Sequence, residues 1–364
     1  MEVLVSFGSK FISASMALYL SALLVGCKSY PGLADPAAPL TEPKRLCSSD
    51  EANDHCLDAL EVERRMQSEE LTVLGAAPTP GGDQGARLFT VRVRDGAKHH
   101  VFRVKWRGPA SAGLVNDPRK ELAAYAVQKL FLEPRQYVAP PTVARCFPEA
   151  EYRELSNDED PTLPGAGCVL GFLSLWLEDV ETVTSARKDR WFEDGEAAWS
   201  PSLFDRDLLY RTSMAHSNLF MYAINHGDPH PGQFILEKTP RGARTYVVDN
   251  SIAFLSIKNP KILFERDWSN LQAPAFPKAT LARIRDLKPG DFEPLGVLAE
   301  FEVAGGKLRR VKQLSGIPVQ NGTDWNQKTL RIGLTPAEIE LVRARFRQLA
   351  ERTDLKSFES QPSK

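Results

Sequence analysis

Two carboxylates on either side of a β-type stretch constrain the fold more than any other feature of this chain. Asp228 lies in a polar string rich in Gly, Pro and His that runs from residue 226 to residue 234. Asp249 ends the apolar run of residues 246–248, far enough along the chain for a β-hairpin to form between the two acids. Such a pair suits phosphoryl transfer, in which one carboxylate accepts the proton of an attacking hydroxyl and the other holds a metal on the phosphates. Mg²⁺ takes oxygen ligands, commonly one or two carboxylates together with phosphate.

The string resembles the catalytic loop of the atypical branches of the protein-kinase-like superfamily, and the run ending in Asp249 resembles their metal loop. These branches include aminoglycoside phosphotransferases, ubiquinone-associated atypical kinases, HipA-type kinases, phosphoinositide lipid kinases and secretory-pathway kinases. Several have a loop of the form H-G-D-x-H-x-x-N, on which His226, Asp228 and His230 fall. The resemblance implies that Asp228 is the catalytic acid/base and that His226 braces the loop. It also implies that Asp249 binds Mg²⁺ or Mn²⁺ on ATP, with an unidentified hydroxyl-bearing acceptor as the second substrate.

Gln233 occupies the position of the final Asn in this pattern, where the resemblance implies a second metal-contacting amide. The additional methylene displaces the amide oxygen by more than the tolerance of ~0.2 Å that metal sites show. A shift of the backbone would restore the contact, and its loss would leave a weak enzyme or a pseudokinase. A catalytically silent binding or scaffold protein is therefore the alternative function.

Two other interpretations of the motif remain open. A string of Gly, Pro, His and Asp also occurs as a plain polar turn between strands. Alternatively, His226, Asp228, His230 and Asp249 form a transition-metal hydrolase site, since histidine and carboxylate are suitable ligands. The string lacks the His pair at i,i+4 that characterises zincins.

The resemblance also implies three upstream features, and each has a structural alternative. A glycine turn that approaches phosphates is expected at Gly81, Gly82 and Gly85, although a flexible hairpin loop has the same composition. Lys105 lies on an alternating run and fits a phosphate-binding strand lysine, with Arg103 and Arg107 as nearby candidates. Glu121, near the start of a helix that follows Asp117-Pro118, fits the partner of Lys105. A glutamate there is also favourable against the helix dipole alone.

These features predict an α+β protein with a two-lobed, protein-kinase-like fold. We expect a small β-rich N-lobe over residues 67–176 and a larger, mainly helical C-lobe over residues 177–358. A long helix over residues 209–224 leads into the catalytic loop. A last helix begins with Thr335, Pro336 and Glu338, which form a capping box with Pro at the first helical position.

The N-terminus predicts export. Residues 1–26 combine Lys10 with an apolar run that suits a signal peptide. The run ends in Leu24-Val25-Gly26-Cys27, which resembles the bacterial lipobox and implies acylation of Cys27. An uncleaved anchor with an incidental cysteine is the alternative. We expect residues 27–66 to be a lipid-anchored tether, and Lys28 in place of a retention Asp implies the outer membrane of a Gram-negative envelope.

The five cysteines bear on disulfide bonds, and the balanced charge bears on possible partners. With Cys27 lipidated, the other four permit three disulfide pairings. Proximity favours Cys47 with Cys56, and Cys146 with Cys168. The absence of C-x-x-C spacing argues against a cysteine metal site. The net charge of −1 gives no reason to expect a nucleic-acid partner.

Overall fold

The computed structural model places residues Leu33–Lys364 in one compact unit. The predicted signal peptide, Cys27 and the glycines Gly81, Gly82 and Gly85 lie outside the residues that it describes. No helix in the described part of the chain is long and apolar enough to cross a membrane. The described residues are 39–43, 45–48, 56–80, 86–108, 117–155, 163–182, 201–228, 231–239, 242–254 and 269–360.

A five-stranded antiparallel sheet forms the first half of the fold, with the strand order β1-β2-β3-β5-β4. Its alternating sequence explains its burial, because Phe89, Val91 and Val93 face the core while Arg92 and Arg94 face solvent. Trp106 is fully buried against the sheet. A Cβ atom at position 171 would lie 2.2 Å from its ring, so only glycine fits there. The strands are β1 (Leu71–Pro78), β2 (Ala86–Asp95), β3 (Lys98–Arg107), β4 (Thr142–Pro148) and β5 (Cys168–Leu175).

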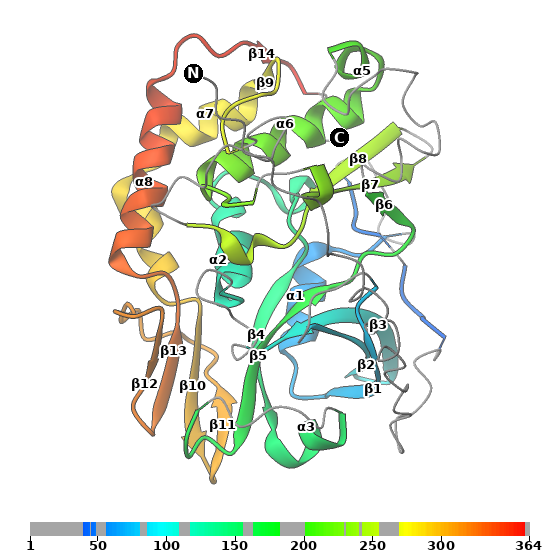
Figure 1. Ribbon diagram of the computed structural model, residues 1–364, viewed down its shortest axis with the longest axis vertical. Helices are drawn as coiled ribbons and strands as arrows, with labels where there is room; N and C mark the ends of the chain where they lie inside the picture. The colour runs from blue at the N-terminus through cyan, green and yellow to red at the C-terminus, as the bar shows by residue number, and fades with distance from the viewer. Residues whose placement is uncertain are drawn as a thin grey trace, which may run out of the picture. The chain divides into compact units, whose positions relative to one another are not determined.

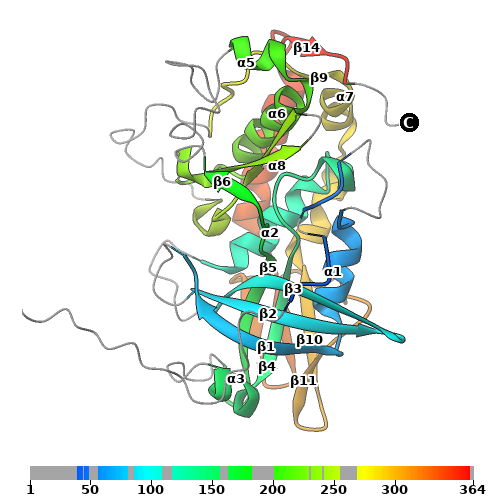
Figure 2. The ribbon, with the colours of Figure 1, turned by 90° about the vertical axis from the view of Figure 1, so that its right-hand side faces the viewer.

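Three helices accompany this sheet, α1 (Ala59–Gln67), α2 (Arg119–Gln128) and α3 (Glu149–Leu155). The helix α1 begins where the Asp58 carboxylate accepts hydrogen bonds from the backbone N–H groups of residues 60 and 61. It buries Val62 and Met66 and packs against β1 and β4 (Figure 2). The last residues of the predicted tether, which was expected over residues 27–66, therefore belong to α1, and their apolar side chains join the core. In Figure 1, α2 lies beside β4 and β5.

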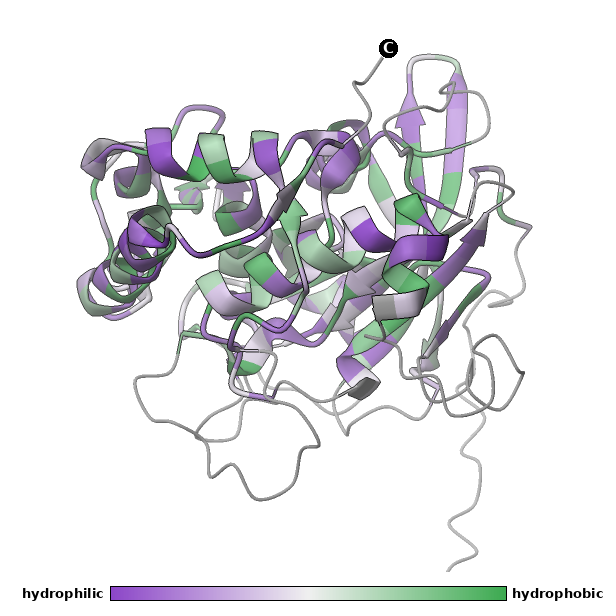
Figure 3. Ribbon diagram, turned by 90° about the horizontal axis from the view of Figure 1, so that it is seen from above, coloured by the Kyte–Doolittle hydropathy of each residue, from purple (hydrophilic) through white to green (hydrophobic). Residues whose placement is uncertain are grey.

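The second half combines a small sheet with long helices. The sheet β6-β7-β8 is antiparallel, and α6 packs on β8. The predicted helix over residues 209–224 is confirmed as α6 (Leu208–Ala223), and the predicted capping box is confirmed at the start of α8 (Pro336–Glu351). Hydrophilic and hydrophobic residues alternate along the helices (Figure 3), as expected when one face is buried. The remaining elements of this half are α5 (Pro201–Arg206), α7 (Lys278–Asp286), β6 (Val180–Thr182), β7 (Phe234–Thr239), β8 (Gly242–Val247), β9 (Phe276–Pro277) and β14 (Ser357–Phe358), with the 3-10 turns η3 (Pro231–Gln233), η4 (Asn250–Ile252) and η5 (Pro289–Gly296). A further 3-10 turn, η2 (Pro134–Gln136), lies between α2 and β4 in the first half.

A four-stranded antiparallel sheet is the main difference from the prediction. It has the order β11-β10-β13-β12 and consists of β10 (Ala299–Ala304), β11 (Lys307–Arg310), β12 (Thr323–Trp325) and β13 (Thr329–Ile332). Phe301, Leu330 and Ile332 from this sheet share a core cluster with Leu170 and Phe172 of β5. The fold is mixed α+β with several antiparallel sheets, and the expectation of a mainly helical second half missed this one.

Two disulfides confirm the predicted pairings. Cys47 pairs with Cys56, and their Cα atoms are 4.9 Å apart. Cys146 pairs with Cys168 across β4 and β5, at a Cα–Cα distance of 5.5 Å. Both distances are ordinary for a disulfide.

Candidate functional site

A cavity of about 330 Å³ brings together several residues that the sequence singled out. One side is formed by β3, β5 and α2, and the other by β6, β7 and the residues after β8. The volume is typical of small-ligand pockets, which combine an apolar lining with a few polar groups. The apolar lining comes mainly from Leu175, Leu177, Val180, Ile235 and Val248, and the polar side chains are Lys105, Glu121, Thr142, Ser174, Thr182, Asp249 and Asn250.

Lys105 enters this pocket because of the alternation of β3. Its neighbours Val104 and Trp106 are fully buried in the core, so the Lys105 side chain extends from the opposite face of the strand. The Lys105 ammonium forms an ion pair with Asp249. The other two basic candidates are engaged elsewhere: Arg103 pairs with Glu178 at 3.1 Å, and the buried Arg107 donates to Ser251 Oγ at 3.3 Å.

Glu121 reaches the same pocket from the first turn of α2. The sequence predicted Lys105 as its partner, but its hydrogen bond is with Asn250. Its carboxylate accepts from Asn250 Nδ2 at 3.4 Å, whereas the ion pair of Lys105 is with Asp249. Burial raises the pKa of Glu121, Lys105 opposes this shift, and the charge of Asp249 adds to it. The structure thus brings Lys105 and Glu121 to one pocket with Asp249 as the direct partner of the lysine.

Asp249 has a left-handed backbone conformation, with φ +56° and ψ +50°. This region is uncommon for residues other than glycine, and Asp is among those that tolerate it. The short turn η4 follows it, and Gly227 N donates to the carbonyl of Ile252 at 3.0 Å. The backbone after β8 is therefore hydrogen-bonded to the loop that contains Asp228.

The Lys105 ammonium also sets the charge of Asp249. Burial alone would raise the pKa of this carboxyl, but the neighbouring Lys105 lowers it below the usual value, with further help from Arg107. Asp249 is therefore a carboxylate at neutral pH. A group of this kind can accept a metal ion once the lysine moves to another anion.

The predicted catalytic loop is held together by its own side chains. His226 is buried, and its Nδ1 accepts a hydrogen bond from the backbone N–H of Asp228 at 3.1 Å. Gln233 is also buried, and its amide nitrogen donates to Asp228 Oδ2 at 2.9 Å. Asp228 is not among the residues that line the pocket, whereas Gly232 is. His230 lies outside the described residues.

This geometry assigns different tasks to the two amides near the site. The nitrogen of Gln233 faces Asp228, so this amide orients the carboxylate. Asn250, which the sequence analysis did not select, lines the pocket and is 2% exposed. Its Oδ1 is buried and accepts no hydrogen bond from the part of the chain that the structure describes. The position of Asn250 directly after Asp249 was the one indication of its place in the sequence. Its contact with Glu121 could not be predicted, because Glu121 lies on a helix far away in the chain.

The donor set fits a hard cation better than a transition metal. Asp249 and Asn250 supply carboxylate and amide oxygens, which Mg²⁺ accepts. Within the described ranges, no group of three or more His, Cys, Asp or Glu side chains is arranged to hold a metal. The Thr142 and Ser174 hydroxyls, 2.9 Å apart, add a polar pair to the wall beside Lys105, and no motif in the sequence indicated them.

A scan against protein-family models and a search of curated proteins found no match to this chain.

Proposed function

We propose that this protein is a metal-dependent phosphotransferase of the kinase-like type, with two lobes around the pocket. It transfers the γ-phosphoryl group of ATP to a hydroxyl-bearing acceptor at the cell envelope, where acylated Cys27 anchors it. The observation that supports this most is the convergence of Lys105, Glu121 and Asp249 on one cavity with an apolar wall. The two disulfides are consistent with an exported protein.

The nucleotide and its Mg²⁺ or Mn²⁺ ion supply the transferable group and neutralise its charge. Among the residues of the chain, Lys105 would leave Asp249 and hold phosphate, and Glu121 would compensate its charge. Asp249 and Asn250 would hold the metal through their oxygens. The apolar wall would pack against the base, and its affinity would come from burial rather than from charge.

The role of Asp228 is that of a proton acceptor for the attacking hydroxyl. Gln233 holds its Oδ2, and His226 holds its backbone N–H, so the side chain is oriented before the acceptor binds. A fixed base saves the entropy of orientation in the transition state. His226 itself braces the loop and takes no part in the chemistry.

A pseudokinase is the second candidate, and one observation favours it. The amide nitrogen of Gln233 faces Asp228, so this residue does not present a second metal ligand as the catalytic-loop pattern implies. In this case the protein is a scaffold without catalytic activity, and its pocket either binds a nucleotide without transferring phosphate or binds no nucleotide.

Calorimetric titration of residues 28–364 with ATP, in the presence of Mg²⁺ or Mn²⁺, tests the proposal. We expect metal-dependent binding that Asp249→Ala abolishes. Asp228→Asn should keep the binding and reduce turnover by about 10²–10⁴-fold, the usual contribution of a general base. Absence of binding at millimolar ATP by a folded protein contradicts the phosphotransferase, and binding without turnover against a broad acceptor panel supports the pseudokinase.

A further inference from the structure

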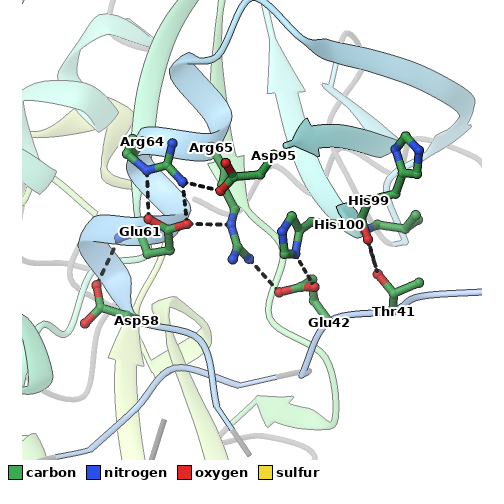
Figure 4. A network of polar contacts seen from close by, with 10 residues as sticks. Thr41, Glu42, Asp58, Glu61, Arg64, Arg65, Asp95, His99 and His100 are labelled. Atoms are coloured by element: carbon green, nitrogen blue, oxygen red, sulfur yellow. Dashed lines mark hydrogen bonds and ion pairs between the residues drawn. The ribbon is translucent and has the colours of Figure 1, made fainter. Parts of the chain in front are cut away.

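The segment that precedes α1 is hydrogen-bonded to β3, the strand that carries Lys105, and to β8, the strand that leads to Asp249. We call residues 39–43 and 45–48 the N-terminal strap. At its first end, Thr41 N donates to the carbonyl of Val101 at 3.1 Å, and Thr41 Oγ1 accepts from Val101 N at 2.9 Å. Val101 belongs to β3, the strand that carries Lys105. Figure 4 shows the strap side chains facing the start of this strand.

Charged side chains strengthen this first attachment. The Glu42 carboxylate accepts from Arg65 Nη1 at 2.6 Å and pairs with His100 Nδ1 at 2.7 Å (Figure 4). The side chains of these three residues are only 12–13% exposed. Because water screens such pairs little, they hold their geometry better than surface ion pairs.

The second end of the strap is attached to β8, the strand that leads to the Asp249 wall. Arg244 of β8 is buried, and its Nη1 donates to the carbonyls of Leu46 and Cys47 at 3.1 and 2.9 Å. Its Nη2 donates to the carbonyls of Arg135 and Tyr137 at 3.1 and 2.9 Å. A guanidinium in this position satisfies four backbone acceptors with fixed geometry. Asp249 follows β8 by only two residues.

The Cys47–Cys56 disulfide closes the strap. Both cysteines are 3% exposed, and the bond joins the end of the strap to the residues that lead into α1. Cys47 N donates to the carbonyl of Leu57 at 2.9 Å, and Leu57 N donates to that of Arg45 at 2.7 Å. One of the carbonyls that Arg244 binds thus belongs to Cys47, a residue of this disulfide.

We infer that the N-terminal strap is a conformational clamp that sets the spacing between the Lys105 wall and the Asp249 wall of the pocket, and that the Cys47–Cys56 disulfide keeps it closed. A segment outside the pocket therefore controls the mobility of the site. The clamp acts on the two walls of the pocket, so it does not depend on which ligand the pocket binds.

Hydrogen exchange of the full chain, followed by mass spectrometry, tests the clamp without nucleotide. The variant is Cys47→Ser with Cys56→Ser. The matched control is Cys146→Ser with Cys168→Ser, which removes the other disulfide. This bond is attached to the start of β5, and the pocket residue Ser174 lies near the opposite end of that strand. We expect the first variant to accelerate exchange at least tenfold in residues 98–105 and 242–252. In the control, faster exchange should be confined to residues around β4 and β5.

Unchanged exchange in both walls, together with faster exchange in residues 39–48, overturns the clamp. If the double serine variant unfolds, Glu42→Gln replaces it, because this change removes one charge at the first attachment and leaves the disulfide intact. It should accelerate exchange in residues 98–105, and no change there also overturns the inference. A calorimetric ATP titration of the same variants is independent, so failure of the proposed function leaves the exchange result valid.

Discussion

At the scale of single residues, the site depends on the direction in which each amide points. Gln233 donates to the Asp228 carboxylate, whereas Asn250 donates to Glu121 and keeps a buried oxygen without a partner among the described residues. An unsatisfied buried acceptor costs about 1–3 kcal/mol, so a ligand that satisfies it gains affinity. The two amides therefore differ in their contacts: Gln233 orients the Asp228 carboxylate, and Asn250 keeps an acceptor oxygen to which no described residue donates.

Gln233→Asn tests this division. Asn is shorter by one methylene, so the hydrogen bond to Asp228 Oδ2 is lost and the carboxylate is misplaced. If the proposed function holds, we expect phosphoryl transfer to fall by about 10²-fold, the effect of a misplacement of about 1 Å, while ATP affinity stays within about twofold. The measurement is turnover and calorimetric affinity, with Gln313→Asn on an exposed loop as the control. A gain of metal-dependent binding or turnover would contradict the orienting role and identify a degenerate site.

At the scale of elements, α6 is held to its neighbours by buried polar contacts. His216 of α6 is 1% exposed, and its Nε2 lies 2.9 Å from the Thr280 hydroxyl of α7. Burial lowers the pKa of His216 to about 3, with smaller contributions from Arg244 and Arg283. The ring is therefore neutral in the native protein. Because α6 leads directly into the loop of His226 and Asp228, this contact supports the position of the site.

The pH dependence of stability tests the contact. In the unfolded chain His216 titrates near its ordinary pKa of about 6.5, so below this pH the unfolded state binds a proton that the native state does not. The stability contributed by neutral His216 is present above pH 6.5 and is lost as the pH falls toward 3, by up to about 1.4 kcal/mol per pH unit. His216→Asn should remove this slope between pH 6.5 and 4.5 in urea denaturation. Equal slopes for the variant, the wild type and the exposed-histidine control His99→Asn would show the contribution to be absent.

At the scale of the whole molecule, the N-terminal segment belongs to the folded body. Leu46, Leu57, Val62 and Met66 are all buried in the main core cluster, together with residues from β8 and α6. Each such side chain contributes about 1.5–3 kcal/mol through burial. Their sum is comparable with the total stability of a typical domain, about 5–15 kcal/mol.

Truncation tests this contribution. A chain that begins at residue 39 should unfold cooperatively with the stability of the chain that begins at residue 28. A chain that begins at residue 67, the predicted start of the N-lobe, should lose more than half of its free energy of unfolding or fail to fold. Thermal and urea denaturation followed by circular dichroism measure the difference. Equal stability of the three chains would mean that α1 and the strap are peripheral.

Local chemistry in the sequence determined much of the fold. The capping box at Thr335 and Glu338, the alternation in β2 and β3 and the two disulfide pairings involve residues that are close in sequence or in register, so short patterns predict them. The sequence also singled out Lys105, Glu121 and Asp249, and the structure brings all three to one pocket. By contrast, the strands β10 to β13 are short and rich in charged residues, so each is too short to show a clear alternation in the sequence. Only the fold shows that their apolar residues pack against β5.

Only the tertiary structure decided which groups pair. Lys105 and Asp249 are 144 residues apart in sequence, and Glu121, the predicted partner of the lysine, lies in the same pocket as a competitor. Likewise, Arg244 donates to four carbonyls, two at residues 46–47 and two at residues 135 and 137. No local sequence pattern connects these two segments with Arg244. Sequence patterns report the conformation that neighbouring residues favour. The choice between several charged partners depends on distances and desolvation, which exist only once the chain has folded.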